Sequence, residues 1–337
     1  MKTKNLFRLA MVATLASTAF FFACNKSSSS NNNTTTDNNV STSADDESMV
    51  SNETDNLTND VTLALSAQTG TNGTAAGIVR LPGTVAVNDV KQANGPGGIT
   101  NDSLICDASI VYDTVDNPKT ITITYNGTNC WGNRTRTGSV VLSMAQGTYW
   151  EQQGASVSIN ISNLVITRVA DGKSITLNGV RTLTNVSGGN LISLPNLQSI
   201  THKIMDSLSI TFADSATRVW QVAKQRVFTY DNGVVITTTG IHSDGTNTNV
   251  AEWGVNRFGV SFESLITEPK VILQSCDFRL TGGQNEILRS DNITTTITYG
   301  LDATGNPTSC PGSGTYYMKV VWTGPNARSV PFILPYF

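Results

Sequence analysis

Four cysteines, Cys106, Cys130, Cys276 and Cys310, are the residues whose type and number indicate chemistry most clearly. Zinc-binding cysteines usually occur in pairs a few residues apart, and no such pair is present in the sequence. An even number of cysteines in an exported chain predicts disulfide bonds. The favoured pairs, Cys106–Cys130 and Cys276–Cys310, would each close a short loop and stabilise the fold by about 3 kcal/mol. The alternative pairs are Cys106–Cys276 and Cys130–Cys310.

The N-terminus predicts such export through a secretory signal over residues 1–23. Three basic residues, Lys2, Lys4 and Arg8, precede an apolar stretch from Leu9 to Ala23. As a helix this stretch would be about 22 Å long, shorter than the roughly 30 Å hydrocarbon core of a membrane. The pattern is therefore typical of a signal peptide and not of a transmembrane helix.

The fifth cysteine, Cys24, is the predicted site of lipid attachment. The segment Phe21-Phe22-Ala23-Cys24 resembles a bacterial lipobox, at which cleavage leaves a lipid-modified cysteine as the first residue. Ala23 fits the small residue expected before the cysteine, whereas Phe21 stands where Leu is usual. Several acyl chains, at roughly 0.8 kcal/mol for each buried CH₂, hold a protein on a bilayer. The alternative is an ordinary signal peptide with an incidental cysteine.

Residues 24–100 are predicted to form a flexible tether. No aromatic residue occurs between Ala23 and Val111, and residues 25–45 are rich in Ser, Asn and Thr. A segment of this composition buries too little apolar surface to offset the entropy lost when it becomes ordered. Apolar residues between Met49 and Leu65 allow one short helix near residues 45–65.

From about residue 101 the apolar residues follow the two-residue period of β-strands. Apolar and polar side chains alternate in segments such as 120–125, 156–162 and 316–322. Strict alternation places one face of a strand in a core and the other in water. Turn pairs such as Asp171-Gly172 and Asn232-Gly233 separate these segments. We predict an all-β body over residues 101–337, with about 14 antiparallel strands in sandwich-like sheets.

A weak internal repeat suggests two related halves, 101–190 and 191–337. Thr120–Tyr125 and Thr294–Tyr299 agree at five of six positions, and a cysteine lies on either side of each segment. Thr-rich strands match easily by chance, so the placement of the cysteines is the stronger part of the comparison. Duplication and chance similarity fit this pattern equally well.

Composition argues against nucleic acid as a partner and offers little for catalysis. The net charge of −3 leaves no basic face for phosphates. The chain contains only two histidines, His202 and His242, and no Gly-x-Ser-x-Gly motif, so we predict structural roles for both. His202 is expected to be a surface or edge side chain of a strand. No pattern singles out a carboxylate pair or a metal site. The sequence favours a non-enzymatic protein and predicts no catalytic residue, cofactor or metal ligand.

Three aromatic residues in polar surroundings are candidates for stacking on sugar rings. Trp131 adjoins Cys130, and Tyr149 and Trp150 precede a polar bend. Exposed aromatic faces bind flat apolar surfaces, including the faces of sugars. The alternative, which we favour, is that these rings cover a disulfide.

Several loose motifs connect the chain to a known group of proteins. Besides the start that ends in Cys24, they comprise the acidic stretch Asp45–Asp60, the strand at 118–123, Arg134-x-Arg-x-Gly138, Trp253–Gly259 and the closing segment Cys276–Cys310. Together they resemble a group of envelope lipoproteins of Bacteroidota-type bacteria. The resemblance implies a mostly-β protein of the cell envelope and carries no activity with it.

The expected function is that of a lipid-anchored outer-membrane protein acting as a non-enzymatic binding, adhesion or structural module. Its expected partners are the membrane, through the N-terminal lipid, and envelope proteins or glycans. Asn25, Lys26 and serines follow Cys24 in place of an acidic surface-export signal, which favours the periplasmic face over the cell surface. The alternative is a carbohydrate-binding or glycan-hydrolysing envelope protein.

Overall fold

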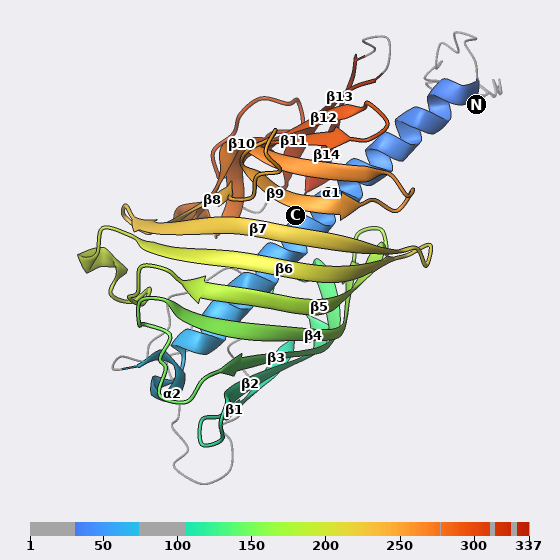
Figure 1. Cartoon of the computed structure of the whole chain (residues 1–337). Coiled ribbons are helices and arrows are strands. Elements are labelled where there is room, and N and C mark those ends of the chain that lie inside the picture. The colour runs from blue at the N-terminus through green and yellow to red at the C-terminus, as the bar shows by residue number, and fades with distance from the viewer. Residues whose placement is uncertain (1–30, 74–104, 277, 311–313, 325–328, 337) are drawn as a thin grey trace, which may run out of the picture.

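A computed structural model of the chain describes residues 31–73, 105–276, 278–310, 314–324 and 329–336. Strands account for 55% of the described residues and helices for 15%, which confirms an antiparallel all-β protein. Figure 1 shows the described elements. Their bounds are α1 Asn31–Ser66, α2 Thr69–Asn72, β1 Ala108–Asp113, β2 Lys119–Thr128, β3 Arg134–Met144, β4 Ala155–Arg168, β5 Ser174–Asn185, β6 Ile200–Phe212, β7 Thr217–Tyr230, β8 Val234–Gly240, β9 Val250–Val255, β10 Ser261–Leu273, β11 Arg279–Arg289, β12 Thr294–Leu301, β13 Tyr316–Thr323 and β14 Ser329–Tyr336, with 3₁₀ turns at Leu194–Asn196 and Gln274–Cys276.

The described strands form one 14-stranded antiparallel sheet, as many strands as the sequence predicts. Almost every strand pairs with its neighbours along the chain. The exceptions are β8 and β9, which do not pair with each other. Both lie between β7 and β10 and pair with different residues of these two strands. The sheet also continues across residues 190 and 191, because β5 pairs with β6 from Ile175 to Asn185. The two suggested halves therefore share a single sheet.

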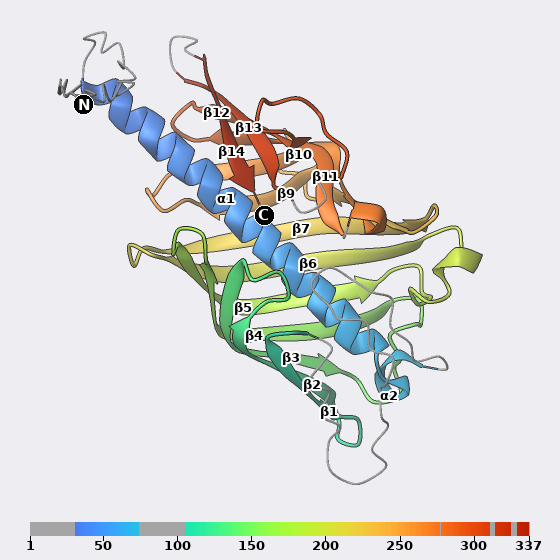
Figure 2. The ribbon, with the colours of Figure 1, turned by 180° about the vertical axis from the view of Figure 1, so that it is seen from behind.

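The sheet curves around α1. Figures 1 and 2, seen from opposite sides, show α1 crossing the concave face from the region of β12–β14 to that of β1–β3. The layer that packs against the sheet is thus a helix. Within the part of the chain that the structure describes, no helix combines the length and the apolar character needed to cross a membrane.

The helix predicted near residues 45–65 is present and is longer than expected, since α1 spans 36 residues. The loose character predicted for the stretch 24–100 does not hold for residues 31–66. Ser, Thr and Asn are weak helix formers, so tertiary packing must supply most of the stability of α1. Its buried Thr58 and Thr62 hydroxyls donate to the carbonyls of Thr54 and Thr58 at 2.9 and 2.8 Å, which satisfies them within the helix. The predicted signal peptide, Cys24 and the remaining tether residues 25–30 and 74–100 lie outside the described residues.

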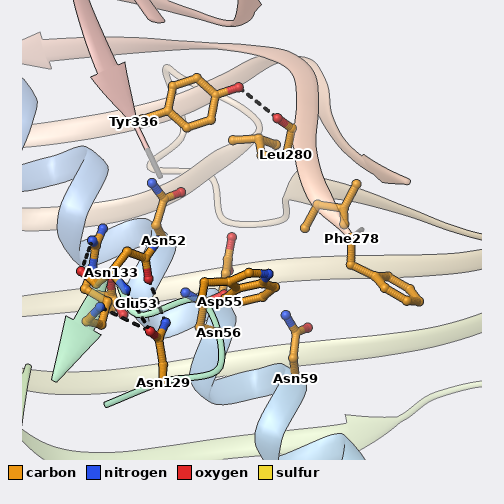
Figure 3. A pocket seen from close by; sticks show the side chains of 13 residues that line it. Asn52, Glu53, Asp55, Asn56, Asn59, Asn129, Asn133, Phe278, Leu280 and Tyr336 are labelled. Carbon is orange, nitrogen blue, oxygen red and sulfur yellow. Dashed lines mark hydrogen bonds and ion pairs between the residues drawn. The ribbon is translucent and has the colours of Figure 1, made fainter. Parts of the chain in front are cut away.

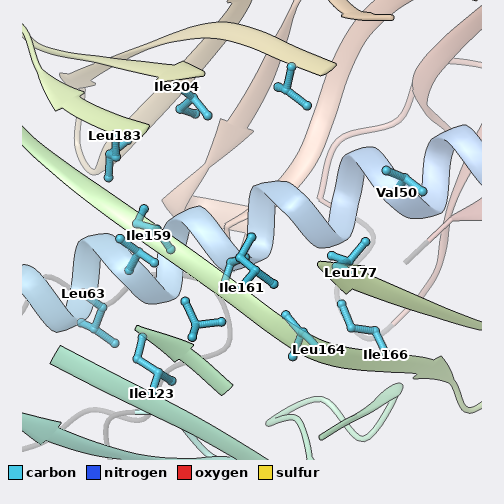
Figure 4. Packing of buried hydrophobic residues seen from close by; sticks show 14 of the residues in the cluster. Val50, Leu63, Ile123, Ile159, Ile161, Leu164, Ile166, Leu177, Leu183 and Ile204 are labelled. Carbon is cyan, nitrogen blue, oxygen red and sulfur yellow. The ribbon is translucent and has the colours of Figure 1, made fainter. Parts of the chain in front are cut away.

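Apolar side chains from α1 and from the concave face of the sheet form one core. Figure 4 shows Val50 and Leu63 of α1 among the isoleucines and leucines of the sheet. Val50 and Leu63 are at most 1% exposed, and Ile123, Ile159 and Leu177 of the sheet are fully buried. Burying a side chain of this size stabilises the fold by about 1.5–3 kcal/mol. The strand alternation seen in the sequence is the pattern that places these residues inside.

Charged side chains of the sheet also point inward, toward α1. Arg181 and Arg226 are at most 1% exposed, and Lys224 and Lys270 are 1% exposed. Burying a charge is costly unless a partner of opposite charge and further hydrogen bonds compensate for the lost water. Acidic and hydroxyl residues of α1 provide many of these partners, so a polar helix can lie inside a sheet.

Candidate functional site

The two predicted disulfides are both present. Cys106 and Cys130 have Cα atoms 5.3 Å apart, and the Cα atoms of Cys276 and Cys310 are 4.9 Å apart. The alternative pairing between the two copies of the repeat is therefore wrong. Each bond lies close in sequence to residues that line a pocket beside α1.

The three aromatic candidates do not act together. Trp150 is 1% exposed and packs edge-on against His202, with ring centroids 4.9 Å apart. A buried ring offers no face to a sugar, so the stacking prediction fails for Trp150. Tyr149 is 37% exposed, but the Lys119 ammonium lies 4.3 Å from its ring centroid. Trp131 is partly exposed and lines a pocket beside α1.

This pocket, here called the seam pocket, lies between α1 and loops from opposite parts of the sheet. Figure 3 shows its residues from close by. One wall comes from the loop between β2 and β3 and the start of β3. The other comes from β10, β11 and β14 and from Phe278, which directly precedes β11. The lining consists of Asn52, Glu53, Asp55, Asn56, Asn59, Asn129, Trp131, Asn133, Arg134, Ile272, Phe278, Leu280 and Tyr336.

Disulfides support both walls of the seam pocket. Trp131 directly follows Cys130 on one wall, and Phe278 follows Cys276 by two residues on the other. The second wall is also tied together by Tyr336, whose hydroxyl donates to the Leu280 carbonyl at 2.8 Å. Loops held in this way lose little conformational freedom when a ligand binds between them.

The charged residues that line the seam pocket are ion-paired. Arg134 Nε donates to Glu53 Oε1 at 2.6 Å, and Asp55 Oδ1 lies 2.9 Å from Arg226 Nη2 and 3.4 Å from Lys224 Nζ. Burial by itself would raise the pKa of Asp55, but Lys224 and Arg226 hold that pKa well below its usual range. Asp55 is therefore ionised, and its charge is balanced by the cations beneath the pocket.

The side-chain amides in the seam pocket have unused hydrogen-bonding capacity. Asn56 is partly exposed and makes no side-chain hydrogen bond with the described residues. Asn52 makes one long bond, 3.4 Å, to the Ser48 hydroxyl. An amide carries two donors and an acceptor with two lone pairs. Asn52 and Asn56 lie four positions apart on α1 and so occupy the same face of the helix.

A wider groove of about 760 Å³ lies beside the first half of α1, but its charged side chains are already used in contacts within the protein. Its cations Arg168, Lys173 and Arg257 are ion-paired with Asp45 or Asp46. These contacts join the helix to turns of the sheet. We therefore interpret the groove as structural.

No protein-family model, curated protein or solved structure matches the chain. The function of the seam pocket must therefore be inferred from its own chemistry.

A carboxylate pair suited to hydrolysis would need an accessible cleft. Glu47 and Glu252 are close enough to interact, and burial followed by repulsion from Glu252 raises the pKa of Glu47 to about 8. The cavity that Glu47 lines has a volume of about 10 Å³, room for roughly one water. This pair is part of the core and cannot receive a glycan.

Both histidines have structural surroundings, but His202 is not the surface or edge side chain expected, because β6 is paired on both sides and the imidazole points into the core. His202 is buried between Trp150 and Phe228, while His242 stacks on Trp253 with centroids 4.1 Å apart. Among the described residues, no group of three or more His, Cys, Asp or Glu could hold a metal ion.

The sequence indicates Trp131 as a candidate binding residue, but it does not indicate the asparagines of α1 or the residues of the second wall of the seam pocket. Asn52, Asn56 and Asn59 recur at the spacing of one helix face. This spacing has no meaning in a flexible tether, which is the structure that the composition predicts for most of residues 24–100. Phe278 and Tyr336 carry no comparable signal, because only the curvature of the sheet brings them to α1.

Proposed function

We propose that the protein is a lipid-anchored envelope protein that acts as a non-enzymatic binding module, held in a fixed orientation by its helix α1. The lipid at Cys24 would hold it on the outer membrane, on the periplasmic face. The seam pocket would be its binding site.

The observation that carries this proposal is the position of α1. At full extension the segment from Cys24 to Asn31 reaches about 25 Å, after which the chain enters the helix. Both overall views show the first turns of α1 projecting beyond the sheet. An anchor at Cys24 would therefore act on the central helix and not on a long surface tether.

Ion pairs connect α1, and with it the proposed anchor, to several strands and turns of the sheet. Along α1, Asp46 binds Arg257 at 2.5 Å, Glu53 binds Arg134 at 2.6 Å and Asp60 binds Arg136 at 2.7 Å. Arg134 and Arg136 both belong to β3, whereas Arg257 lies in the turn between β9 and β10, in a distant part of the sheet. Buried pairs hold their geometry because separating them would leave an uncompensated charge. The arrangement suits a module that must keep a fixed orientation above a membrane.

Fractionation of cells tests the anchoring. Native protein is expected in the outer-membrane fraction, resistant to protease added to intact cells, with an acylated N-terminal peptide in mass spectrometry. Cys24→Ala should abolish acylation and membrane association, whereas Ser27→Ala serves as the matched control. Acyl-free native protein in the soluble fraction would refute the proposal.

A further inference from the structure

We propose that the seam pocket binds an uncharged saccharide, held by the Asn52 and Asn56 amides of α1 between Trp131 and Phe278. This inference rests on the proposed role as a binding module and adds the chemical class of the ligand.

The polar floor of the pocket matches sugar hydroxyls. Each hydroxyl both donates and accepts a hydrogen bond, and each amide offers both functions in one plane. Asn56 makes no side-chain hydrogen bond with the described residues, and Asn52 makes only the 3.4 Å bond to Ser48. The two amides can therefore bond a ligand without breaking a strong contact of the folded protein.

The walls of the pocket match the apolar faces of a sugar ring. Trp131, which is partly exposed, belongs to one wall. Phe278 and Leu280 belong to the other and are 6% and 8% exposed, so they present only an edge to the pocket. Aromatic and aliphatic side chains pack against the C–H groups of a sugar, while the ring hydroxyls reach polar groups at its edge. The disulfide next to each wall keeps these side chains in place before the ligand arrives.

The electrostatics of the pocket favour a ligand without charge. Its charged lining residues are Glu53, Asp55 and Arg134, and each is paired. Arg134 donates through Nε to the Glu53 carboxylate and through Nη1 to the Asn133 carbonyl, so its charge is already balanced by Glu53. An anionic ligand would find no unpaired cation among the described lining residues, and burying its charge without a partner would be costly.

The size of the pocket indicates how the saccharide binds. The enclosed part has a volume of about 40 Å³, room for roughly two or three waters. Only the edge of one sugar ring can enter, while the rest of the saccharide lies in the mouth between the walls. A terminal or protruding sugar unit fits this geometry better than a long chain passing through.

Binding can be measured with the full mature protein, purified in detergent. The probes are neutral cello-, xylo-, malto-, manno- and chito-oligosaccharides, followed on a glycan array and by calorimetry. At least one neutral probe is expected to bind, and the double variant Asn52→Ala/Asn56→Ala should weaken it at least about tenfold. Asn160→Ala, at an exposed asparagine on the outer face of β4, should bind like the native protein.

Three outcomes would overturn the inference. They are the absence of binding to any neutral probe, equal affinity in the double variant and the native protein, and a preference for the acidic probes polygalacturonate or heparin. Unchanged unfolding midpoints would show that the variants are folded. The array reports on ligand class alone and the fractionation on anchoring alone, so failure of one is distinguishable from failure of the other.

Discussion

Arg181 illustrates how single residues hold this core together. Its guanidinium forms a two-pronged contact with the buried Asp206 carboxylate, at 2.5 to 2.9 Å. It also donates to the Thr54 carbonyl and the Thr58 hydroxyl of α1, at 2.7 and 2.6 Å. One side chain therefore joins β5, β6 and the helix. Because it is 1% exposed, water cannot replace any of these contacts.

Replacing Arg181 alone is expected to be much more harmful than replacing the whole pair. Arg181→Met leaves Asp206 buried without a partner, which should lower the free energy of unfolding by about 3–5 kcal/mol. The double variant Arg181→Met/Asp206→Leu removes both charges and should recover a large part of that loss. Urea unfolding of the three proteins measures this difference. Equal destabilisation in both variants would contradict the assigned pairing.

Glu47 predicts sensitivity of the protein to alkaline pH. Its carboxyl faces Glu252 of β9, Lys224 of β7, and Lys270 and Ser264 of β10. The pKa is near 4.5 ordinarily and about 8 in the folded protein, chiefly because of burial and then Glu252. The folded state thus holds a proton that the unfolded chain has already released. Stability should therefore fall as the pH rises from 4.5 through 8.

Glu47→Gln tests this expectation because glutamine stays neutral. The variant and the native protein should unfold at similar urea concentrations at pH 5. At pH 9 the variant should be the more stable, since it carries no buried charge to oppose folding. The measurement is the unfolding midpoint at pH 5, 7 and 9. Parallel curves across this range would show that Glu47 is not the group responsible.

Among the elements, the strands β4 to β6 show how the two faces of the sheet differ. Outward positions carry Ser156, Ser158 and Asn160 in β4, and Thr182 and Ser207 in β5 and β6. The inward positions of the same strands carry isoleucines and leucines together with the Arg181–Asp206 pair. The low overall charge of the chain is thus combined with charges that are concentrated inside, against α1.

The disulfides contribute to stability at the level of loops. Cys106 and Cys130 are 24 residues apart, so their bond restricts a loop of moderate length in the unfolded chain. Cys106→Ser/Cys130→Ser is expected to lower the free energy of unfolding by about 3 kcal/mol. Denaturant unfolding, compared with the matched pair Cys276→Ser/Cys310→Ser, checks the value. An unchanged midpoint would mean that the loop is already ordered in the unfolded state.

For the whole molecule, α1 and the sheet depend on each other. The helix is too polar to be stable alone, and without it the sheet would expose an apolar face containing unpaired charges. A chain that starts at residue 101 is therefore expected to lack a fixed tertiary structure, with weak near-ultraviolet circular dichroism and strong binding of a hydrophobic dye.

A chain that starts at residue 31 is the control and should fold. Adding a peptide of residues 31–73 to the shorter chain should restore part of the near-ultraviolet signal, because it returns partners such as Glu53 and Asp60 to Arg134 and Arg136. A folded, dye-free protein from residue 101 onward would show that the sheet does not need its helix.

Local patterns in the sequence were enough to predict the strands and the disulfides. Strand alternation is a local property of neighbouring residues, which is why segments such as Thr120–Tyr125 could be predicted as antiparallel strands. The two cysteine pairs followed from their number and from the short loops they close. Trp131 was singled out by its place beside Cys130, and it does line the seam pocket.

Tertiary contacts were needed to show that residues 31–66 form a largely buried helix and that Asn52 and Asn56 line a pocket. The reason is that the partners of α1 are distant in sequence: Asp46 and Arg257 are 211 positions apart, and Arg226 and Asn59 are 167 apart. Composition counts apolar surface and predicts that such a segment stays loose. Composition does not show which charges a curved sheet brings to the helix, and these charges offset the cost of burying its acidic side chains.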